Sequence, residues 1–152
     1  MSLQIEIRTA TGQDIQAIAS IEAQRFSEPW LPESLEEARL RQDNIFLVAD
    51  WGGQVAGYAL LYGTLDEGEI PTIATHPDFS HMGVGTKLLQ ELLRECGNRG
   101  IARVFLEVRR SNIKAQGLYY KCNFEVVGQR KDFYRFPTED ALVMVCQVPR
   151  QQ

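Results

Sequence analysis

Two glycines separated by one residue form the motif of this sequence with the clearest chemical potential. They lie in His81-Met82-Gly83-Val84-Gly85-Thr86, between a segment typical of a strand and a strongly amphipathic helix. The first N–H groups of a helix have no partner within it, and with the helix dipole they attract phosphate oxygens. Glycine suits such a turn because a Cβ would keep the ligand away from the backbone. The motif predicts a phosphate-binding turn, and a plain turn remains the alternative.

Two familiar phosphate motifs fit this turn poorly. The dinucleotide-binding fingerprint requires a third glycine three residues further on, where Leu88 stands. A P-loop requires Gly-Lys followed by Ser or Thr, whereas Lys87 here follows Thr86. Any phosphates bound here would therefore belong to another kind of ligand.

Hydrophobic periodicity predicts the elements that position the turn. Leucines at 88, 89, 92 and 93 form one face of a helix, and residues 102–108 alternate as a strand does. Helices are expected over about 12–25, from Pro32 onward, over 83–98 and over 112–122. Strands are expected over 4–8, 45–50, 54–62, 69–75, 102–108, 124–130 and 141–148, with a loop through Phe133-Tyr134-Arg135.

These elements predict an α+β, or mixed α/β, fold. Seven strands and four helices, joined by both hairpins and crossovers, imply a mostly antiparallel mixed sheet flanked by helices. No repeat or linker divides the 152 residues, so residues 1–152 are expected to form one domain.

The composition narrows the function classes. With 44% hydrophobic and 24% charged residues, the chain is typical of a soluble folded protein. The apolar run over 55–63 is too short to span a membrane, and the N-terminus lacks the features of a secretory signal, so a cytoplasmic location without membrane partners is expected. The three cysteines, Cys96, Cys122 and Cys146, are widely spaced, which predicts neither a disulfide framework nor a metal site.

The net charge of −4 is unevenly distributed. Residues 1–70 carry four Arg, no Lys and twelve acidic residues, a charge of −8, whereas residues 71–152 carry twelve basic and eight acidic residues, a charge of +4. The overall acidity argues against nucleic acid as a partner. The asymmetry suggests two differently charged ligands, with solvated helix faces as the alternative.

A larger set of motifs resembles the acetyl-CoA core of the Gcn5-related N-acetyltransferase (GNAT) superfamily. The resemblance covers about residues 5–148. Within it, residues 106–112 and 118–119 closely resemble the bacterial ribosomal-protein alanine N-acetyltransferases (RimI-like), and Pro29-Trp30 and Phe133-Tyr134 extend the match into the substrate-side segments. The segments that carry it are 66–77, 82–89, Leu106-Glu107-Val108-Arg109-Arg110-Ser111-Asn112, Leu118-Tyr119, Pro29-Trp30 and Phe133-Tyr134.

The resemblance implies acetyl-CoA as cosubstrate and no metal. It assigns the coenzyme to the backbone of one strand, to the glycine turn with the helix start that follows, and to two further side chains. These residues are Ile73, Ala74 and Thr75, then His81, Met82, Gly83, Val84, Gly85, Thr86 and Lys87, and finally Asn112 and Tyr119. The family usually has Gln or Arg three residues before the first glycine, where this chain has Ser80, so the turn would rely on its backbone amides.

The resemblance further implies direct attack of an amine on the thioester in a ternary complex. Glu107, at the end of its strand, would accept the proton of the amine directly or through water, or hold the cationic amine. Tyr119 would donate a hydrogen bond or a proton to the departing thiolate. Because an α-amine has a pKa of about 8 and a Lys amine one of about 10.4, an N-terminal acceptor needs less help from a base.

The acceptor side follows from the RimI-like segments. The residues expected to contact the acceptor are Phe26, Pro29, Trp30, Glu69 and Tyr134. The expected acceptor is a protein or peptide N-terminus, with a small amine as the second reading. A non-catalytic acyl-CoA-binding regulatory module is the alternative from another class, and the chain is expected to be a monomer or a homodimer.

Overall fold

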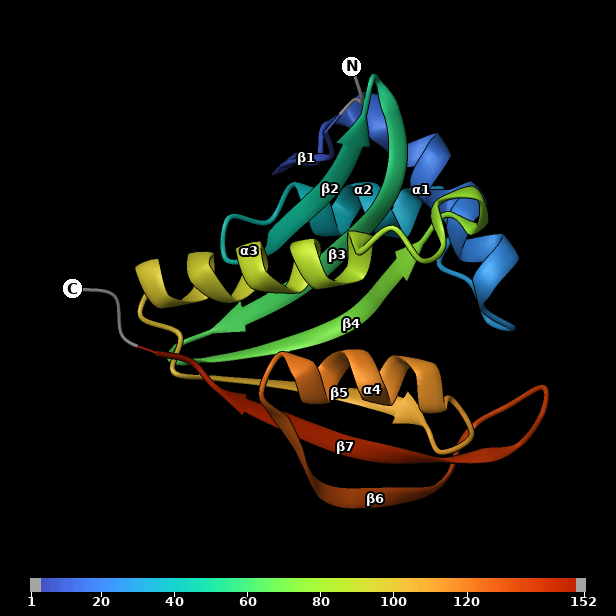
Figure 1. Cartoon of the computed structure of the whole chain (residues 1–152), viewed down its shortest axis with the longest axis vertical. Helices are drawn as coiled ribbons and strands as arrows, with labels where there is room; N and C mark the ends of the chain where they lie inside the picture. The colour runs from blue at the N-terminus through green and yellow to red at the C-terminus, as the bar shows by residue number, and fades with distance from the viewer. Residues whose placement is uncertain (1–3, 150–152) are drawn as a thin grey trace.

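The computed structural model describes residues 4–149, which form a seven-stranded sheet with helices on both faces (Figure 1). This arrangement confirms the expected fold class. The elements are β1 (Glu6–Thr9), the 3-10 turn η1 (Gly12–Asp14), α1 (Ile15–Arg25), α2 (Pro32–Arg39), β2 (Ile45–Trp51), β3 (Gln54–Thr64), β4 (Glu67–Thr75), the 3-10 turn η2 (Pro77–Phe79), α3 (Val84–Asn98), β5 (Arg103–Arg109), α4 (Ile113–Lys121), β6 (Phe124–Tyr134) and β7 (Glu139–Gln147).

The sheet splits in its middle, between β4 and β5. The strand order is β1-β2-β3-β4-β5-β7-β6, and β4 and β5 are parallel whereas the other neighbouring strands are antiparallel. Their pairing ends at Ile70 and Leu106, and beyond this point the two strands diverge (Figure 1).

A bulge in β4 coincides with the end of this pairing. On β3, Leu60 pairs with Thr72 and Tyr62 pairs with Glu69, so β4 has one residue more than β3 between these two pairs. Such a bulge bends and twists its strand. Pro71 lies in the bulge and has no N–H to donate to β5. Together these features explain why β4 leaves β5 here.

Two clusters of buried side chains hold the helices to opposite faces of the sheet. Helices α1 and α2 pack on one face, against alternate residues of β2 and β3 such as Val48 and Leu60. Helix α3 packs on the other face, where its Leu88, Leu89 and Leu92 are fully buried, and α4 contributes Tyr119 to the same cluster. The predicted leucine stripe of α3 is therefore a core face.

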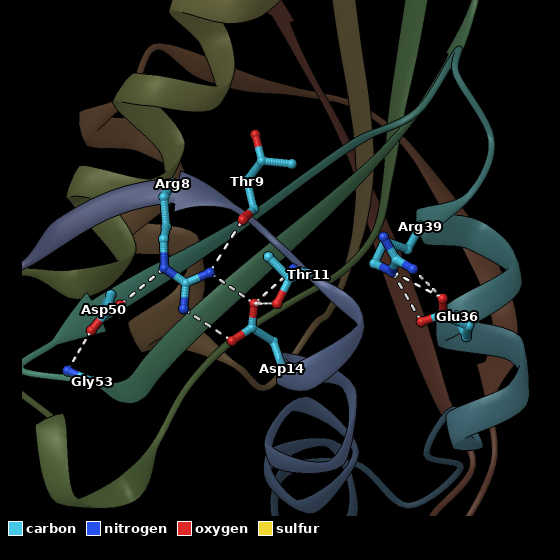
Figure 2. Close-up of polar contacts among 8 residues, drawn as sticks. All are labelled: Arg8, Thr9, Thr11, Asp14, Glu36, Arg39, Asp50 and Gly53. Carbon is cyan, nitrogen blue, oxygen red and sulfur yellow. Dashed lines mark hydrogen bonds and ion pairs between the residues drawn. The ribbon is translucent and has the colours of Figure 1, made fainter.

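The first helix is fixed to the sheet by Arg8 of β1 (Figure 2). Its guanidinium donates to Asp14 Oδ2 at 2.8 Å and to Asp50 Oδ2 at 2.9 Å, so β1, η1 and the end of β2 meet at one cation. Asp14 also accepts from the backbone N–H of Thr11 at 2.7 Å, as in a capping box. The hydrogen bond from Arg8 makes the largest contribution to lowering the pKa of the Asp14 carboxyl.

The main difference from the expected elements lies in the last hairpin. Residues 131–134 were expected to be loop, but β6 continues to Tyr134, which pairs with Glu139 after a register shift that begins at Arg130. A strand with such an irregular register has no clean alternation of polar and apolar residues. The hydrophobic periodicity therefore placed the end of the predicted strand too early. Within residues 4–149, no helix is long and apolar enough to cross a membrane.

Candidate active site

The divergence of β4 and β5 leaves one edge of β4 without a neighbouring strand. The backbone N–H of His76 donates to Ala56 O at 2.8 Å, which fixes which residues of β4 face β3. Because N–H groups alternate along a strand, Ala74 faces β3, whereas Ile73 and Thr75 face the open edge. The Nε of Arg25 donates to Thr75 O at 2.9 Å, consistent with this direction. Of the three predicted residues, Ile73 and Thr75 therefore have N–H groups that face the open edge, and their contact with a coenzyme stays a prediction.

The glycine turn also presents free backbone amides. Gly83 precedes α3 in a left-handed conformation with φ 75°, and its N-cap position has no side-chain hydrogen bond. A Cβ on Gly83 would meet no atom within 4 Å, so the space beside its backbone is open. The first intrahelical bond is from Lys87 N to Gly83 O at 3.1 Å, which leaves the N–H groups of residues 83–86 without helical partners.

The two glycines have different roles. A Cβ on Gly85 would lie 2.8 Å from Leu118 Cδ2, so Gly85 permits α4 to approach the start of α3. The amide of Lys87 is used within the helix, so only its side chain is free for the expected contact with the coenzyme, which stays a prediction. His81, also with a positive φ of 66°, and the exposed Met82 lie before Gly83 in the same turn.

The position of the expected Gln or Arg is occupied by a serine that is turned inward. Ser80 Oγ donates to Pro77 O at 3.0 Å and accepts from Arg25 Nη2 at 3.4 Å. Arg25 thus reaches from the end of α1 to both the open edge of β4 and this turn. The sequence reading missed Arg25, since an arginine at the end of a helix is also an ordinary surface residue.

Glu107 projects from β5 on the face opposite the buried Val104, Leu106 and Val108, as the alternation predicted. Burial raises the pKa of its carboxyl, and the Glu69 carboxylate adds to this effect, while the Arg130 guanidinium opposes it. Arg130 Nε lies 3.5 Å from Glu107 Oε1. The raised pKa makes the ionised carboxylate a stronger proton acceptor than an ordinary glutamate.

Tyr134 interacts electrostatically with both predicted catalytic residues, Glu107 and Tyr119. Burial and the Glu107 carboxylate raise the pKa of Tyr134 to about 12. Tyr119 on α4 is 6% exposed, and burial followed by the neighbouring Tyr134 raises its pKa, so it is a neutral phenol that can donate a proton or a hydrogen bond. The Tyr134 phenol on β6 thus interacts electrostatically with Glu107 on β5 and with Tyr119 on α4.

A groove of about 1580 Å³ runs along the face that carries Glu107. Pro29, Trp30 and Glu69 line it together with Glu107, as expected of acceptor residues, whereas Phe26 and Tyr134 are not among its lining residues. The alternation along neighbouring strands could have identified further lining residues that the sequence reading missed, namely Tyr62, Phe105, Arg130 and Val143.

A buried carboxylate was also missed. Glu22 of α1 is 1% exposed, and its Oε1 accepts from Tyr58 Oη at 2.6 Å and from Thr72 Oγ1, while its Oε2 accepts from Trp30 N at 3.1 Å. It thereby connects the groove residue Trp30 to β3 and to β4. The available signal was its spacing from Ile15 and Ile18, which places it on the apolar face of α1.

Asn112 is confirmed as the N-cap of α4, because its Oδ1 accepts from Ala115 N at 3.1 Å. Its expected contact with a coenzyme is a separate matter and stays a prediction. Within residues 4–149, no cluster of three or more His, Cys, Asp or Glu could hold a metal ion.

A split mixed sheet, with free backbone amides at a helix start on one side and a half-buried carboxylate on the other, agrees with the class of enzyme that the sequence motifs resemble, the N-acetyltransferases. The chain matches the model of the acetyltransferase (GNAT) family over residues 15–124. It therefore belongs to this family and is an N-acetyltransferase.

Named relatives refine this similarity. The chain is 35% identical to N-alpha-acetyltransferase RimI of Mycobacterium tuberculosis, covering 92% of this chain and 90% of that protein. It is 33% identical to the ribosomal protein bS18-alanine N-acetyltransferase of Escherichia coli strain K12, covering 86% and 89%. The crystal structure of the ribosomal-protein-S18-alanine N-acetyltransferase from Escherichia coli superposes with a TM-score of 0.90 at 28% identity, covering 98% of this chain and 97% of that one.

The two charged neighbours of Glu107 should shift its pKa in opposite directions, which can be tested by substitution. Arg130→Gln removes a cation that favours the ionised carboxylate, so the pKa of Glu107 should rise. Glu69→Gln removes an anion, so the pKa should fall. A ¹³C NMR titration of the Glu107 carboxyl in the two variants and the wild type measures both changes. Shifts in the same direction, or none in either variant, would contradict this arrangement of charges.

Proposed function

We propose that the enzyme transfers the acetyl group of acetyl-CoA to the N-terminal α-amine of a protein, as the names of its relatives state for ribosomal protein bS18. The observation that carries this proposal is the groove beside Glu107. Its volume of about 1580 Å³ exceeds the range of about 300–1,000 Å³ usual for small-molecule pockets. A peptide can extend along it from an amine placed at Glu107. We further propose that the reaction takes place in the bacterial cytoplasm.

The described residues fit acetyl-CoA as cosubstrate. The amides of residues 83–86 are free and the space at Gly83 is open, as the diphosphate of the coenzyme requires. The N–H groups of Ile73 and Thr75 on the open edge of β4 are suited to bind the pantetheine arm and to stabilise negative charge on the thioester oxygen. Acetyl-CoA supplies the activated acetyl group, and no covalent intermediate with the protein is needed.

Glu107 and Tyr119 move the protons of the reaction. Glu107 holds the incoming ammonium group by charge and accepts its proton, a role for which a raised pKa is favourable. An α-amine, with a pKa of about 8, is partly neutral at pH 7, so this transfer is less demanding than for lysine. Tyr119 Oη provides the proton or hydrogen bond that the departing sulfur needs.

The charge of the groove favours a cationic acceptor. Glu37, Asp43, Glu67 and Glu69 line it, all from the acidic first half of the chain, and Glu107 joins them from the second half. Arg41, Arg99 and Arg130 also line it, so the five acidic side chains exceed the basic ones by two. Among these groups, Arg99 pairs with Glu95 at 3.1 Å and Glu67 pairs with Arg103 at 2.6 Å. The asymmetry seen in the sequence thus corresponds in part to the two sides of the site.

The acceptor class is tested by measuring thiol release from acetyl-CoA with a matched panel. The panel contains the N-terminal peptide of ribosomal protein bS18, the same peptide with a blocked N-terminus and an internal lysine, and polyamines and free amino acids. We expect rapid release with the free N-terminus and little with the blocked peptide. Activity restricted to the small amines would contradict the peptide acceptor, and no release with any acceptor would favour a non-catalytic module.

The role of Tyr119 makes a separate prediction. Tyr119→Phe keeps the ring that packs near Phe124 but removes the hydroxyl, so kcat should fall by about 10²-fold or more, as for loss of a general acid. Coenzyme affinity should change little. Steady-state kinetics and a direct titration with coenzyme A measure the two quantities. Tyr120→Phe, on the exposed neighbour, is the control, and an unchanged kcat in Tyr119→Phe would remove Tyr119 from the mechanism.

A further inference from the structure

We propose that Arg109 is a positioning residue that fastens together the two chain segments beside the acceptor site. These are the α1–α2 segment (residues 26–31) and the β6–β7 segment (residues 135–138). The inference rests on the proposed function, because it assigns these segments to acceptor binding. It concerns the side chain of Arg109, the last residue of β5 and two positions beyond Glu107.

The Arg109 guanidinium contacts both segments at once. Its Nη1 donates to Pro137 O at 2.9 Å and to Glu139 Oε1 at 3.1 Å. Its Nη2 donates to Arg135 O at 3.0 Å and to Ser27 Oγ at 3.2 Å. Four acceptors from the two sides of the site therefore surround one cation, whose side chain is 23% exposed.

The β6–β7 segment depends on these bonds for its shape. Two of them are to the backbone carbonyls on either side of Phe136, a residue that is 70% exposed and has a positive φ of 55°. A bulky residue in this conformation costs free energy and needs support from its surroundings. Arg109 holds the backbone carbonyls on both sides of Phe136, and the Arg135 guanidinium lies 5.5 Å from the centroid of the Phe136 ring.

Arg109 also contacts Tyr134, the last residue of β6, where the β6–β7 segment begins. The guanidinium carbon lies 4.5 Å from the centroid of the Tyr134 ring, a cation–π contact. Tyr134 interacts electrostatically with Glu107 and with Tyr119. Through one side chain, the orientation of this ring is thus coupled to the α1–α2 segment, which also carries the groove residues Pro29 and Trp30.

Two further contacts join the segments directly, and they provide controls. Ser27 Oγ donates to Arg135 O at 2.9 Å, and Arg135 Nη2 pairs with Glu28 Oε2 at 3.0 Å. The Arg135–Glu28 pair is exposed at 68% and 48% of its side chains, so water screens it strongly. The carbonyl of Arg135, which Arg109 uses, would remain in an Arg135→Gln variant.

The coenzyme side should not depend on the Arg109 side chain. Its bonds reach neither the open edge of β4 nor the turn at residues 80–87. The adjacent start of α4 is held by bonds from Gln116 Nε2 to the carbonyls of Arg109 and Arg110, which are backbone groups that a substitution retains. Loss of the guanidinium should therefore affect acceptor binding selectively.

The test compares Arg109→Lys with Arg109→Met and with Arg135→Gln, which breaks only the direct ion pair between the segments. Lysine keeps the charge but lacks the planar group that donates to several acceptors at once, so it separates geometry from charge. We expect the KM for an N-terminal peptide to rise by about tenfold or more in both Arg109 variants, while the KM for acetyl-CoA stays within about twofold. Arg135→Gln removes only the exposed ion pair with Glu28, so it should raise the peptide KM less than either Arg109 variant does.

Amide hydrogen exchange gives a second readout that does not require activity. In both Arg109 variants, exchange should accelerate together over residues 26–31 and 135–138, with little change over 80–87; in Arg135→Gln it should change less. Unchanged exchange in the two segments, equal rises of both KM values, or full rescue of the peptide KM by lysine would overturn the inference. A wild type that acetylates no peptide would refute the proposed function, and the exchange data would still decide whether Arg109 joins the segments.

Discussion

The separation of β4 from β5 is the constraint on which the rest of the site depends. Up to Ile70 the two strands pair as in any parallel sheet, and beyond it a bulge with Pro71 ends the ladder. The edge that becomes free carries backbone N–H groups without a strand partner, which are ordinarily a liability in a folded protein. Here they face the place where the proposed cosubstrate binds. The same separation allows α3 and α4 to start on either side of the opening, and it leaves Glu107 at the end of β5 accessible from the groove.

Buried and partly buried charged side chains fix the segments of the acceptor side relative to the gap between β4 and β5. Glu22 accepts hydrogen bonds from Tyr58, Thr72 and the backbone of Trp30, so β4 and the segment after α1 cannot shift independently. A buried carboxylate with all its donors in place is stable, and one that loses a donor is costly. Arg109 plays the corresponding part at the end of β5. The two networks place the groove against the edge of β4.

The sequence predicted the fold class, the elements and most of the helix starts, because these depend on local periodicity and on caps such as Asn112. It failed where the ladder is irregular, as at Tyr134, which lies in β6 beyond a register shift. Phe26 and Tyr134 were predicted beside the acceptor but do not line the groove, since their placement depends on long-range packing. Glu22 and Arg25 were missed for a similar reason: both act through contacts with β4, about 50 residues further along the chain.

The central claim is that the open edge of β4 and the amides before α3 bind acetyl-CoA. It is tested most directly by residue-resolved amide hydrogen exchange with and without the coenzyme. In the free protein, the amide of Ala74, which faces β3, should exchange slowly, and those of Ile73 and Thr75 should exchange faster. Saturation with acetyl-CoA should slow Ile73, Thr75 and residues 83–86 while leaving Ala74 nearly unchanged. Binding of acetyl-CoA without protection of Ile73 and Thr75 would contradict the account.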